Sequence, residues 1–331
     1  MPDRLPPRYD LGDFTLYAIS DGLYRLDGGA MFGVVPKVLW EKVKPPDARN
    51  RIDMCLTCLL VVAGDTRILI EAGIGDKNPD KFNDIYGVDR ITTIDEELGR
   101  LGLDASEIDH VVLTHLHFDH AGGLTVLNEK GVPIPHFPNA RHHVHALEWE
   151  AATHPHARNR ASYIPADWMP VYEAGLMDLC SPATHLPGSD DFEIIPGITC
   201  HHLGGHSEGL MMVRIESSKP VAAGVGANLV FARRSVRVAV FPGDLIPTGA
   251  HVPVPWIMGY DLDPRAMVEM KERFLSQWEE ERALIVFVHE TRYPWGFVKS
   301  EARPSGRAFS AEPLDKGWLE PLRRVKWPEL P

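Results

Sequence analysis

The sequence predicts an α+β protein in which two β-sheets pack together and carry helices on their outer faces. Strand-like segments come first, strand–helix alternation follows, and the same order returns in the second half of the chain. The apolar fraction of 44% is enough to fill a sizeable core between two sheets. Because sheets bury their faces against each other and against helices, this order favours a layered architecture. We expect the 331 residues to form a single domain, 1–331.

The N-terminal segments predict strands followed by an apolar loop. Residues 14–26 (FTLYAISDGLYRL) are rich in apolar and aromatic positions, and Asp21 and Gly22 within them predict a turn between two strands. Residues 26–45 are rich in glycine yet apolar, which is not typical of a plain solvated loop. We therefore expect an N-terminal apolar loop that packs against the protein.

The next segments predict a hairpin, a helix and a further strand. Residues 55–73 predict a hairpin with Gly64 and Asp65 at its turn. Residues 92–103 place apolar side chains at helical spacing. Residues 108–120 predict a short buried strand that runs into a histidine-rich motif.

The second half of the chain repeats the alternation of strand and helix. Residues 131–200, rich in histidine, proline and tryptophan, are expected to be an insertion with a helix near 146–152. Strand-like valines mark residues 221–244. Residues 263–281 form the clearest helix, with a proline near the start and an apolar stripe. Residues 283–290 predict a buried strand that leads to a histidine.

The two ends of the chain show no targeting signal. The C-terminal tail, 300–331, holds five prolines and is expected to wrap the surface. The start, MPDRLPPRYD, has neither the basic nor the apolar region of a signal peptide. No apolar run approaches the roughly 18 residues of a membrane span. We therefore expect a cytoplasmic protein without a membrane partner.

The net charge narrows the class of binding partner, and the cysteine spacing bears on whether the chain holds a zinc ribbon. The formal net charge is −12, which argues against nucleic acid and anionic membranes as partners and favours a small-molecule substrate. The oligomeric state stays open, a homodimer included. Cys55 and Cys58 form a C-x-x-C pair without a second pair, so buried thiols are favoured over a zinc ribbon.

The stretch VVLTHLHFDHAGG, residues 111–123, concentrates potential metal ligands. His115 and His117 are two apart, so in a continuing strand they would share one face and reach one metal. Asp119 and His120 cannot share that geometry, but a turn just before them would present them to a second metal. Imidazole and carboxylate together suit zinc, manganese, iron or cobalt better than calcium or magnesium.

Three further residues could bind a metal, and each of them follows an apolar segment of the chain. They are His206 in HHLGGHSEG, Asp244 at the end of VAVFPGD, and His289 near the end of LIVFVHE. Open-sheet proteins place their sites at the carboxyl ends of strands. The resulting set of histidines and aspartates predicts two divalent transition metals with one bridging carboxylate. Zinc is the first expectation, with manganese, iron and cobalt as alternatives.

The motifs THLHFDHAGG, LGGHSEG, FPGD and FVHE, in this order, resemble the metallo-β-lactamase superfamily. The resemblance is to its dinuclear hydrolase branch, with glyoxalase II, acyl-homoserine-lactone lactonases and methyl parathion hydrolase. It covers residues 108–290, and LLVVAGDTRILIEAGIG extends it to about residue 58. It implies an αβ/βα four-layer sandwich of two mixed β-sheets flanked by helices. It also implies two ligand sets and a bridge: His115, His117 and His206; Asp119, His120 and His289; and Asp244 between them.

Three departures from the family pattern bear on the site. Where many members have the aspartate of ILIDTG, this chain has Glu71, which we expect to orient a metal ligand without binding the metal. Asp244 stands where antibiotic-hydrolysing lactamases carry cysteine, which argues against β-lactamase activity. His117 stands where the diiron flavoproteins carry glutamate, which argues against an oxygen-reducing site.

Together the motifs predict a metal-dependent hydrolase. A hydroxide bridging the metals would attack a carbonyl or phosphoryl centre, with Asp119 and Asp244 as catalytic carboxylates and Asp244 taking the proton. The expected substrate is a small, partly apolar lactone, ester or phosphotriester. Two alternatives stay open: a glyoxalase II-like thioester hydrolase, and a non-catalytic metal-binding protein.

Other aromatic and histidine residues have weaker assignments. Trp256 and Tyr260, with the apolar loop, would line a substrate pocket, although an ordinary core position is equally compatible. His251 follows the Asp244 motif closely and could face the same pocket. Three more histidines are expected to be structural or exposed: His142, His143 and His145.

Overall fold

The computed structural model describes residues 4–181, 191–219, 236–304, 306–314 and 318. Within them, one seven-stranded sheet has the order β1-β2-β3-β4-β5-β8-β9. Its parallel pairs are β4–β5, β5–β8 and β8–β9, and its other pairs are antiparallel, so the sheet is mixed. Its strands are β1 (Arg8–Leu11), β2 (Phe14–Asp27), β3 (Arg51–Ala63), β4 (Thr66–Ile70), β5 (His110–Val112), β8 (Arg141–His145) and β9 (Met177–Cys180).

A second seven-stranded sheet of the described residues runs β10-β11-β12-β13-β14-β15-β16. Only its β13–β14 pair is parallel, so this sheet is also mixed. Its strands are β10 (Phe192–Ile195), β11 (Ile198–His202), β12 (Met211–Glu216), β13 (Val238–Phe241), β14 (Leu284–Val286), β15 (Trp295–Arg303) and β16 (Gly306–Leu314). Of the strand expected over 221–244, only the end falls within the described residues, as β13. A short separate hairpin joins β6 (Thr125–Leu127) to β7 (Pro133–Pro135).

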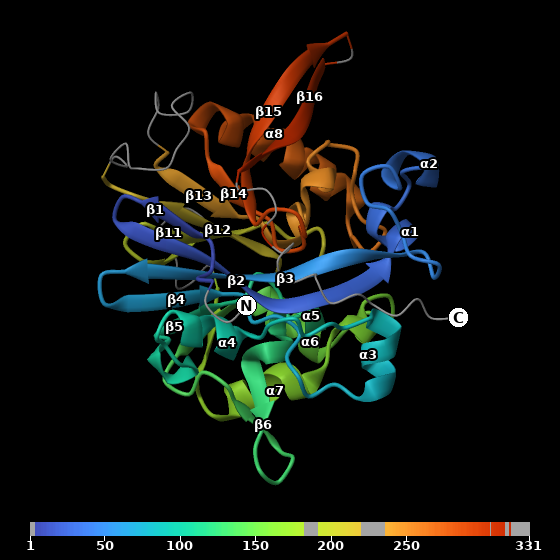
Figure 1. The fold of residues 1–331 in the computed structure, drawn as a ribbon. Helices are drawn as coiled ribbons and strands as arrows, with labels where there is room; N and C mark the ends of the chain where they lie inside the picture. Colours follow the sequence, from blue (N-terminus) through green and yellow to red (C-terminus); the bar gives the residue numbers. More distant parts are fainter. Residues whose placement is uncertain (1–3, 182–190, 220–235, 305, 315–317, 319–331) are drawn as a thin grey trace.

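Helices cover the outer face of each sheet, as Figure 1 shows with α4, α6 and α7 beyond the first sheet and α8 beyond the second. No helix of the described residues is long and apolar enough to cross a membrane. The helices are α1 (Gly28–Phe32), α2 (Lys37–Trp40), α3 (Asp80–Tyr86), α4 (Ile94–Arg100), α5 (Phe118–Ala121), α6 (Ala146–Thr153), α7 (Pro165–Glu173) and α8 (Pro264–Glu281).

Buried apolar clusters separate the layers. One cluster lies between the sheets and joins Leu59 and Val112 of the first sheet to Phe241 of the second. A second packs the first sheet against its helices, with Trp168 of α7 at its centre. A third packs the second sheet against α8 through Trp278. The four-layer sandwich of two mixed sheets and flanking helices is therefore confirmed.

Helix α8 shows how closely the sequence specifies some elements. Pro264 occupies its first turn, where a missing N–H costs nothing, and the side chain of Asp263 accepts a hydrogen bond from the N–H of Ala266. Arg282 ends the helix in a left-handed conformation. The expected helix over 263–281 thus matches the observed helix almost to the residue.

The turn expected at Asp21 and Gly22 is wrong. These residues form an irregularity within the continuous strand β2, whose pairing with β3 resumes after it. Gly22 adopts a φ of 98°, which glycine tolerates best. The Asp21 carboxylate turns inward and accepts hydrogen bonds from the N–H groups of Ile74 and Gly75. A long neighbouring strand therefore imposes a bulge where local sequence favours a turn.

Two terminal segments are more regular than expected. The apolar loop over 26–45 contains α1 and α2, whose Phe32 and Trp40 are buried, so its apolar character reflects packing. The tail was expected to wrap the surface, but residues 300–303 and 306–314 belong to the antiparallel pair β15–β16. Pro313 fits because β16 lies at the edge of its sheet, where a missing N–H is tolerated. Most of the remaining tail lies outside the described residues.

Candidate metal centre

The histidine-rich motif lies in a loop, since strand β5 ends at Val112. The strand therefore does not continue through His115 and His117, and their approach comes from the loop conformation. His117 is the N-cap of α5, which puts Asp119 in the first turn of that helix. The expected change of direction before Asp119 is thus a helix start.

The first ligand group consists of His115, His117 and His206. Each offers a ring nitrogen, and these nitrogens lie within 4.8 Å of one another. The Nε2 atom of His206 is 3.2 Å from Nδ1 of His117. His206 follows Gly204 and Gly205, both with positive φ, in the loop between β11 and β12. All three side chains are buried.

The second ligand group consists of Asp119, His120 and His289, whose ligand atoms also lie within 4.8 Å of one another. The Oδ2 atom of Asp119 is 3.6 Å from Nε2 of His289 and 3.7 Å from Nε2 of His120. His289 follows β14 in the second sheet. The two sheets therefore both contribute to this group.

Asp244 lies between the two groups and faces each with a different oxygen. Its Oδ2 is 3.3 Å from Nε2 of His206 and 4.0 Å from Nε2 of His115. Its Oδ1 is 3.4 Å from Nε2 of His289 and 3.6 Å from Nε2 of His120. Asp244 thus contacts histidines of both groups.

Unpaired buried atoms gather at this centre. Nε2 of His115, His117 and His120 and Oδ1 of Asp244 are inaccessible and accept or donate no hydrogen bond. Buried polar atoms normally have a partner, because an unpaired one costs about 1–3 kcal/mol. Imidazole nitrogen and carboxylate oxygen are the ligands of divalent transition metals, so this donor set fits such ions.

The pKa values of His115, His117 and Asp244 are lowered by different causes. Burial lowers the pKa of His115 and His117 well below its ordinary value, so both rings are neutral and carry a lone pair. Burial alone would raise the pKa of Asp244, but His120 and His206 lower it well below its usual range. The bridging carboxylate is therefore ionised, as a metal ligand must be.

Three of the histidine rings are each held by a hydrogen bond with a neighbouring group on the side away from the centre. Such partners select the tautomer and leave Nε2 directed at the centre. The contacts are Thr114 Oγ1 to His115 Nδ1 (3.0 Å), Asp261 Oδ1 to His206 Nδ1 (2.9 Å) and the carbonyl of Cys55 to His289 Nδ1 (2.8 Å).

Glu71 lies beside the centre, where the sequence suggested it. Its Oε1 accepts a hydrogen bond from the N–H of Thr114 at 3.1 Å, and its Oε2 is 3.4 Å from Nδ1 of His120. Glu71 has a φ of 68°, a left-handed conformation that is uncommon for a residue with a side chain. Its functional role stays a prediction.

Sequence reasoning missed several side chains that contact the ligand groups, among them Tyr24 and Asp261. Tyr24, fully buried on β2, donates a hydrogen bond to Oδ2 of Asp119 at 2.5 Å and lies 3.3 Å from Nε2 of His289. Asp261 holds His206, as described above. Neither lies in a motif, since a tyrosine in a strand and an aspartate before a helix are both ordinary.

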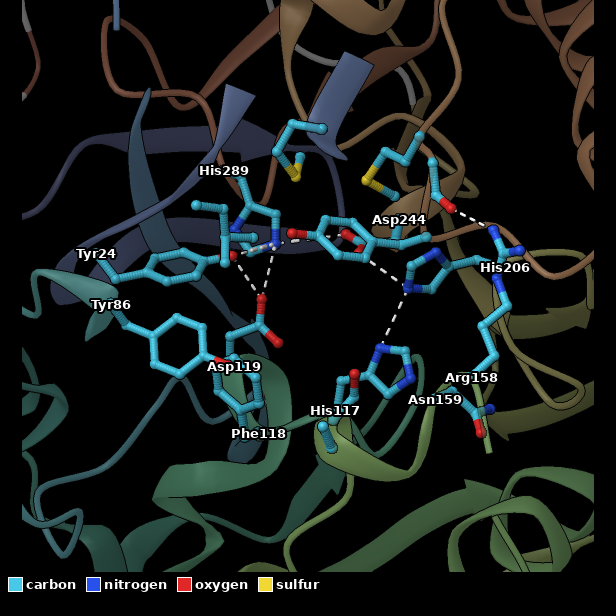
Figure 2. A pocket seen from close by; sticks show the side chains of 17 residues that line it. Tyr24, Tyr86, His117, Phe118, Asp119, Arg158, Asn159, His206, Asp244 and His289 are labelled. Atoms are coloured by element: carbon cyan, nitrogen blue, oxygen red, sulfur yellow. Dashed lines mark hydrogen bonds and ion pairs between the residues drawn. The ribbon is translucent and has the colours of Figure 1, made fainter. Parts of the chain in front are cut away.

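A pocket of about 390 Å³ opens over the centre (Figure 2). In Figure 2, Tyr24, Tyr86 and Phe118 lie around Asp119, and Arg158 and Asn159 lie on the side of His117 and His206. Its lining comprises Tyr24, Leu26, Met31, Tyr86, His117, Phe118, Asp119, Arg158, Asn159, Ala161, Ser162, His206, Asp244, Met258, Gly259, Tyr260 and His289.

The structure agrees with some of the weaker residue assignments and contradicts others. Tyr260 lines the pocket as expected, but Trp256 packs edge-on against Phe32 and is not part of the lining. His251 does not face the pocket, since its ring stacks on Phe32 and its Nε2 contacts the carbonyl of Met31 at 2.8 Å. His142, His143 and His145 are buried in β8 and belong to neither ligand group, and His143 instead lies in a separate cluster with Asp178 and Cys180.

The fold and the centre together define a class of α+β protein with clustered histidine and aspartate side chains that could hold metal ions. A family model described as the metallo-beta-lactamase superfamily matches residues 57–289. The chain belongs to this superfamily, which confirms the resemblance of its motifs.

Known relatives and structures agree with this assignment. A "probable metal-dependent hydrolase" of Staphylococcus aureus has a solved structure that is 32% identical, with a TM-score of 0.75 over 87% of this chain and 94% of that one. A "probable metallo-hydrolase" of Mycobacterium tuberculosis is 31% identical over 154 residues, or 42% of this chain and 46% of that protein. An N-acyl homoserine lactonase of a Bacillus species is 26% identical over 192 residues, or 54% of this chain and 65% of that protein. The match thus spans less than two thirds of either of these last two relatives.

The structure of a dizinc quorum-quenching lactonase is also similar. It has a TM-score of 0.67 at 20% identity, over 95% of this chain and 99% of that chain. At this identity the similarity shows the fold alone.

Proposed function

We propose that this protein is a metal-dependent hydrolase that opens a lactone or ester of a small, partly apolar substrate, with phosphotriesters as a further class. The single observation that carries the proposal is the position of Asp244, whose two oxygens face two separate ligand groups. Divalent metals held there would activate a water molecule and polarise the substrate's carbonyl or phosphoryl oxygen. His115, His117 and His206 would hold one metal, and Asp119, His120 and His289 the other.

The chain's own residues would supply the remaining chemistry. The ionised Asp244 carboxylate lies where it can take the proton of the attacking water. Asp119, held by Tyr24, would orient the reacting groups on the other side. Tyr86 and Phe118, whose ring centroids lie 4.8 Å apart, give the pocket an apolar wall that excludes water from the reaction.

Lactones are favoured as the substrate class. The Bacillus relative is named for this activity, and the structurally similar lactonase holds a hydrolysed lactone product. The pocket combines aromatic and apolar walls with polar side chains, which suits a substrate that has a polar group and one apolar arm.

A hydrolysis panel tests the proposal. Purified protein loaded with zinc or manganese would be given lactones, aryl esters, phosphotriesters and lactoylglutathione, before and after strong chelation. We expect turnover of lactones above the other classes and loss of that turnover on chelation. Fast turnover of lactoylglutathione alone would favour the thioester alternative, and no turnover of any substrate would support a non-catalytic protein.

A further inference from the structure

A buried glutamate outside every ligand motif lies between the two loops of the first ligand group. Glu148 stands in the first turn of α6, and its side chain has no exposed surface. It does not line the pocket. Burying an ionisable carboxylate is costly unless hydrogen bonds compensate, so its partners indicate what it does.

Three donors from separate segments converge on this carboxylate. Its Oε1 accepts hydrogen bonds from the N–H of Leu116 and from the hydroxyl of Tyr163, both at 2.9 Å. Its Oε2 accepts a hydrogen bond from the N–H of Gly209 at 3.1 Å. Leu116 lies between the two histidines of the first motif, and Gly209 lies three residues after His206. One side chain thus ties together both loops that carry the first ligand group.

The packing around Glu148 is equally close. A Cβ atom on Gly209 would lie 2.2 Å from the backbone nitrogen of Glu148, so only glycine lets this loop approach α6. The ring of Tyr163 packs edge-on against His117 with centroids 4.9 Å apart. The carboxylate and its tyrosine partner therefore act on the first ligand group through both backbone and ring contacts.

The second ligand group is held by different contacts. Glu71 approaches His120, Tyr24 bonds Asp119, and the carbonyl of Cys55 bonds His289. None of these contacts involves Glu148, although Glu71 also accepts a hydrogen bond from the N–H of Thr114 in the first loop. The two groups share Asp244, and Glu148 bonds loops of the first group alone.

We propose that Glu148 is a positioning residue that clamps the first ligand group, so that it governs the occupancy of one metal position and not the other. The proposal rests on the dinuclear centre of the proposed function. Hydrogen bonds to a carboxylate are strong, and here they add to the direct bond between the two segments from the N–H of Met211 to the carbonyl of Thr114 at 2.9 Å.

The test is the metal content of Glu148→Gln, measured by elemental analysis after equilibration with buffered zinc. The amide keeps the size of the side chain, but its NH₂ group must face one of two backbone N–H donors, so one loop loses its partner. Affinity at the first position should fall about 10–100-fold, as for other contacts to ligand-bearing groups. At limiting zinc the parent should hold two ions per chain and the variant about one.

The matched control is Glu150→Gln, the same change two residues further along α6, at an exposed side chain that pairs with His154. It should hold as much metal as the parent. A Glu148→Gln variant with the parent's metal content at limiting zinc would overturn the clamp. Loss of both ions together would overturn the assignment of Glu148 to the first group alone.

Combined variants identify which ion is lost. Adding His206→Ala to Glu148→Gln should change little, because both remove the same metal. Adding His289→Ala should empty the protein. The reverse pattern would show that Glu148 acts on the second group, and would overturn the proposal.

A milder variant keeps the test decisive if Glu148→Gln does not fold. Tyr163→Phe removes one donor to the carboxylate and keeps the ring, so it should weaken the same metal by a smaller factor. An unchanged first-site affinity in that variant would then overturn the proposal. A parent protein without metal would refute the proposed function and the clamp together, whereas a two-metal parent with an unchanged variant would refute the clamp alone.

Discussion

Replacing Asp244 by alanine should disable the whole centre while leaving the fold in place. Its oxygens lie 3.3 Å from Nε2 of His206 and 3.4 Å from Nε2 of His289, so one residue serves both groups. The side chain belongs to none of the apolar clusters that join the layers. The Asp244→Ala variant should therefore keep the parent's circular dichroism spectrum.

The size of the effect follows from the number of ligands. Each metal would have four protein ligands, three from its own group plus Asp244. A complete four-ligand zinc site is worth roughly 10–16 kcal/mol, so one ligand is worth about 2.5–4 kcal/mol. Each metal would then bind about 10²–10³-fold more weakly, and activity that needs both should fall by at least ~10³-fold.

Metal content and kcat/KM for a lactone, measured side by side, check this estimate. The control is Asp65→Ala, which removes an exposed carboxylate at the β3–β4 turn. A variant at position 244 that keeps two ions and activity within a few-fold of the parent would refute the bridging role.

Substitutions at three other residues should have smaller effects on activity, metal binding or stability. Tyr24→Phe removes the donor to Asp119 and should lower kcat/KM about tenfold or more with an unchanged melting temperature, measured by steady-state kinetics and thermal unfolding. Glu71→Ala should weaken metal binding more than Glu71→Gln, which keeps size and most hydrogen bonding, and excess metal should ease both defects; equal metal titrations for parent and variants would contradict this. Lys271→Met removes the hydrogen-bond donor of three backbone carbonyls, which Lys271 Nζ contacts at 2.6–2.9 Å. It should cost about 3 kcal/mol, or ~4 °C in melting temperature by calorimetry, and an unchanged transition would show those carbonyls find other partners.

Much of the fold could be predicted because local pattern and tertiary packing agree. The hairpin over 55–73 and the helix over 263–281 combine apolar periodicity with turn or cap residues, and both exist. The prediction failed where tertiary contacts overrode local preference. Asp21 and Gly22 favour a turn, but pairing with β3 on both sides of them imposes a bulge. The prolines of the tail suggested an irregular chain, but Pro313 lies in an edge strand, which tolerates it.

The clustering of the candidate ligands could be predicted because each belongs to a short motif near the end of an apolar segment. The structure brings all of them together, although a loop and a helix start do so in place of a continuing strand. Tyr24 and Asp261 could not be predicted in this way. Tyr24 is 95 residues from Asp119, and Asp261 is 55 residues from His206, so only the packed sheets define these contacts.

The position of His289 shows why part of this site is invisible in sequence. It follows the second sheet, yet the first sheet holds it through backbone atoms of β3. The N–H of Cys55 bonds the carbonyl of His289 at 3.2 Å, the N–H of Thr57 bonds the carbonyl of Val288 at 2.9 Å, and the carbonyl of Cys55 accepts from Nδ1 of His289. The buried free thiols of Cys55 and Cys58 match the core role expected of them. This segment of β3 contributes to the centre through its main chain instead. Many different side chains would permit the same backbone contacts, so no residue type in the sequence indicates this contribution.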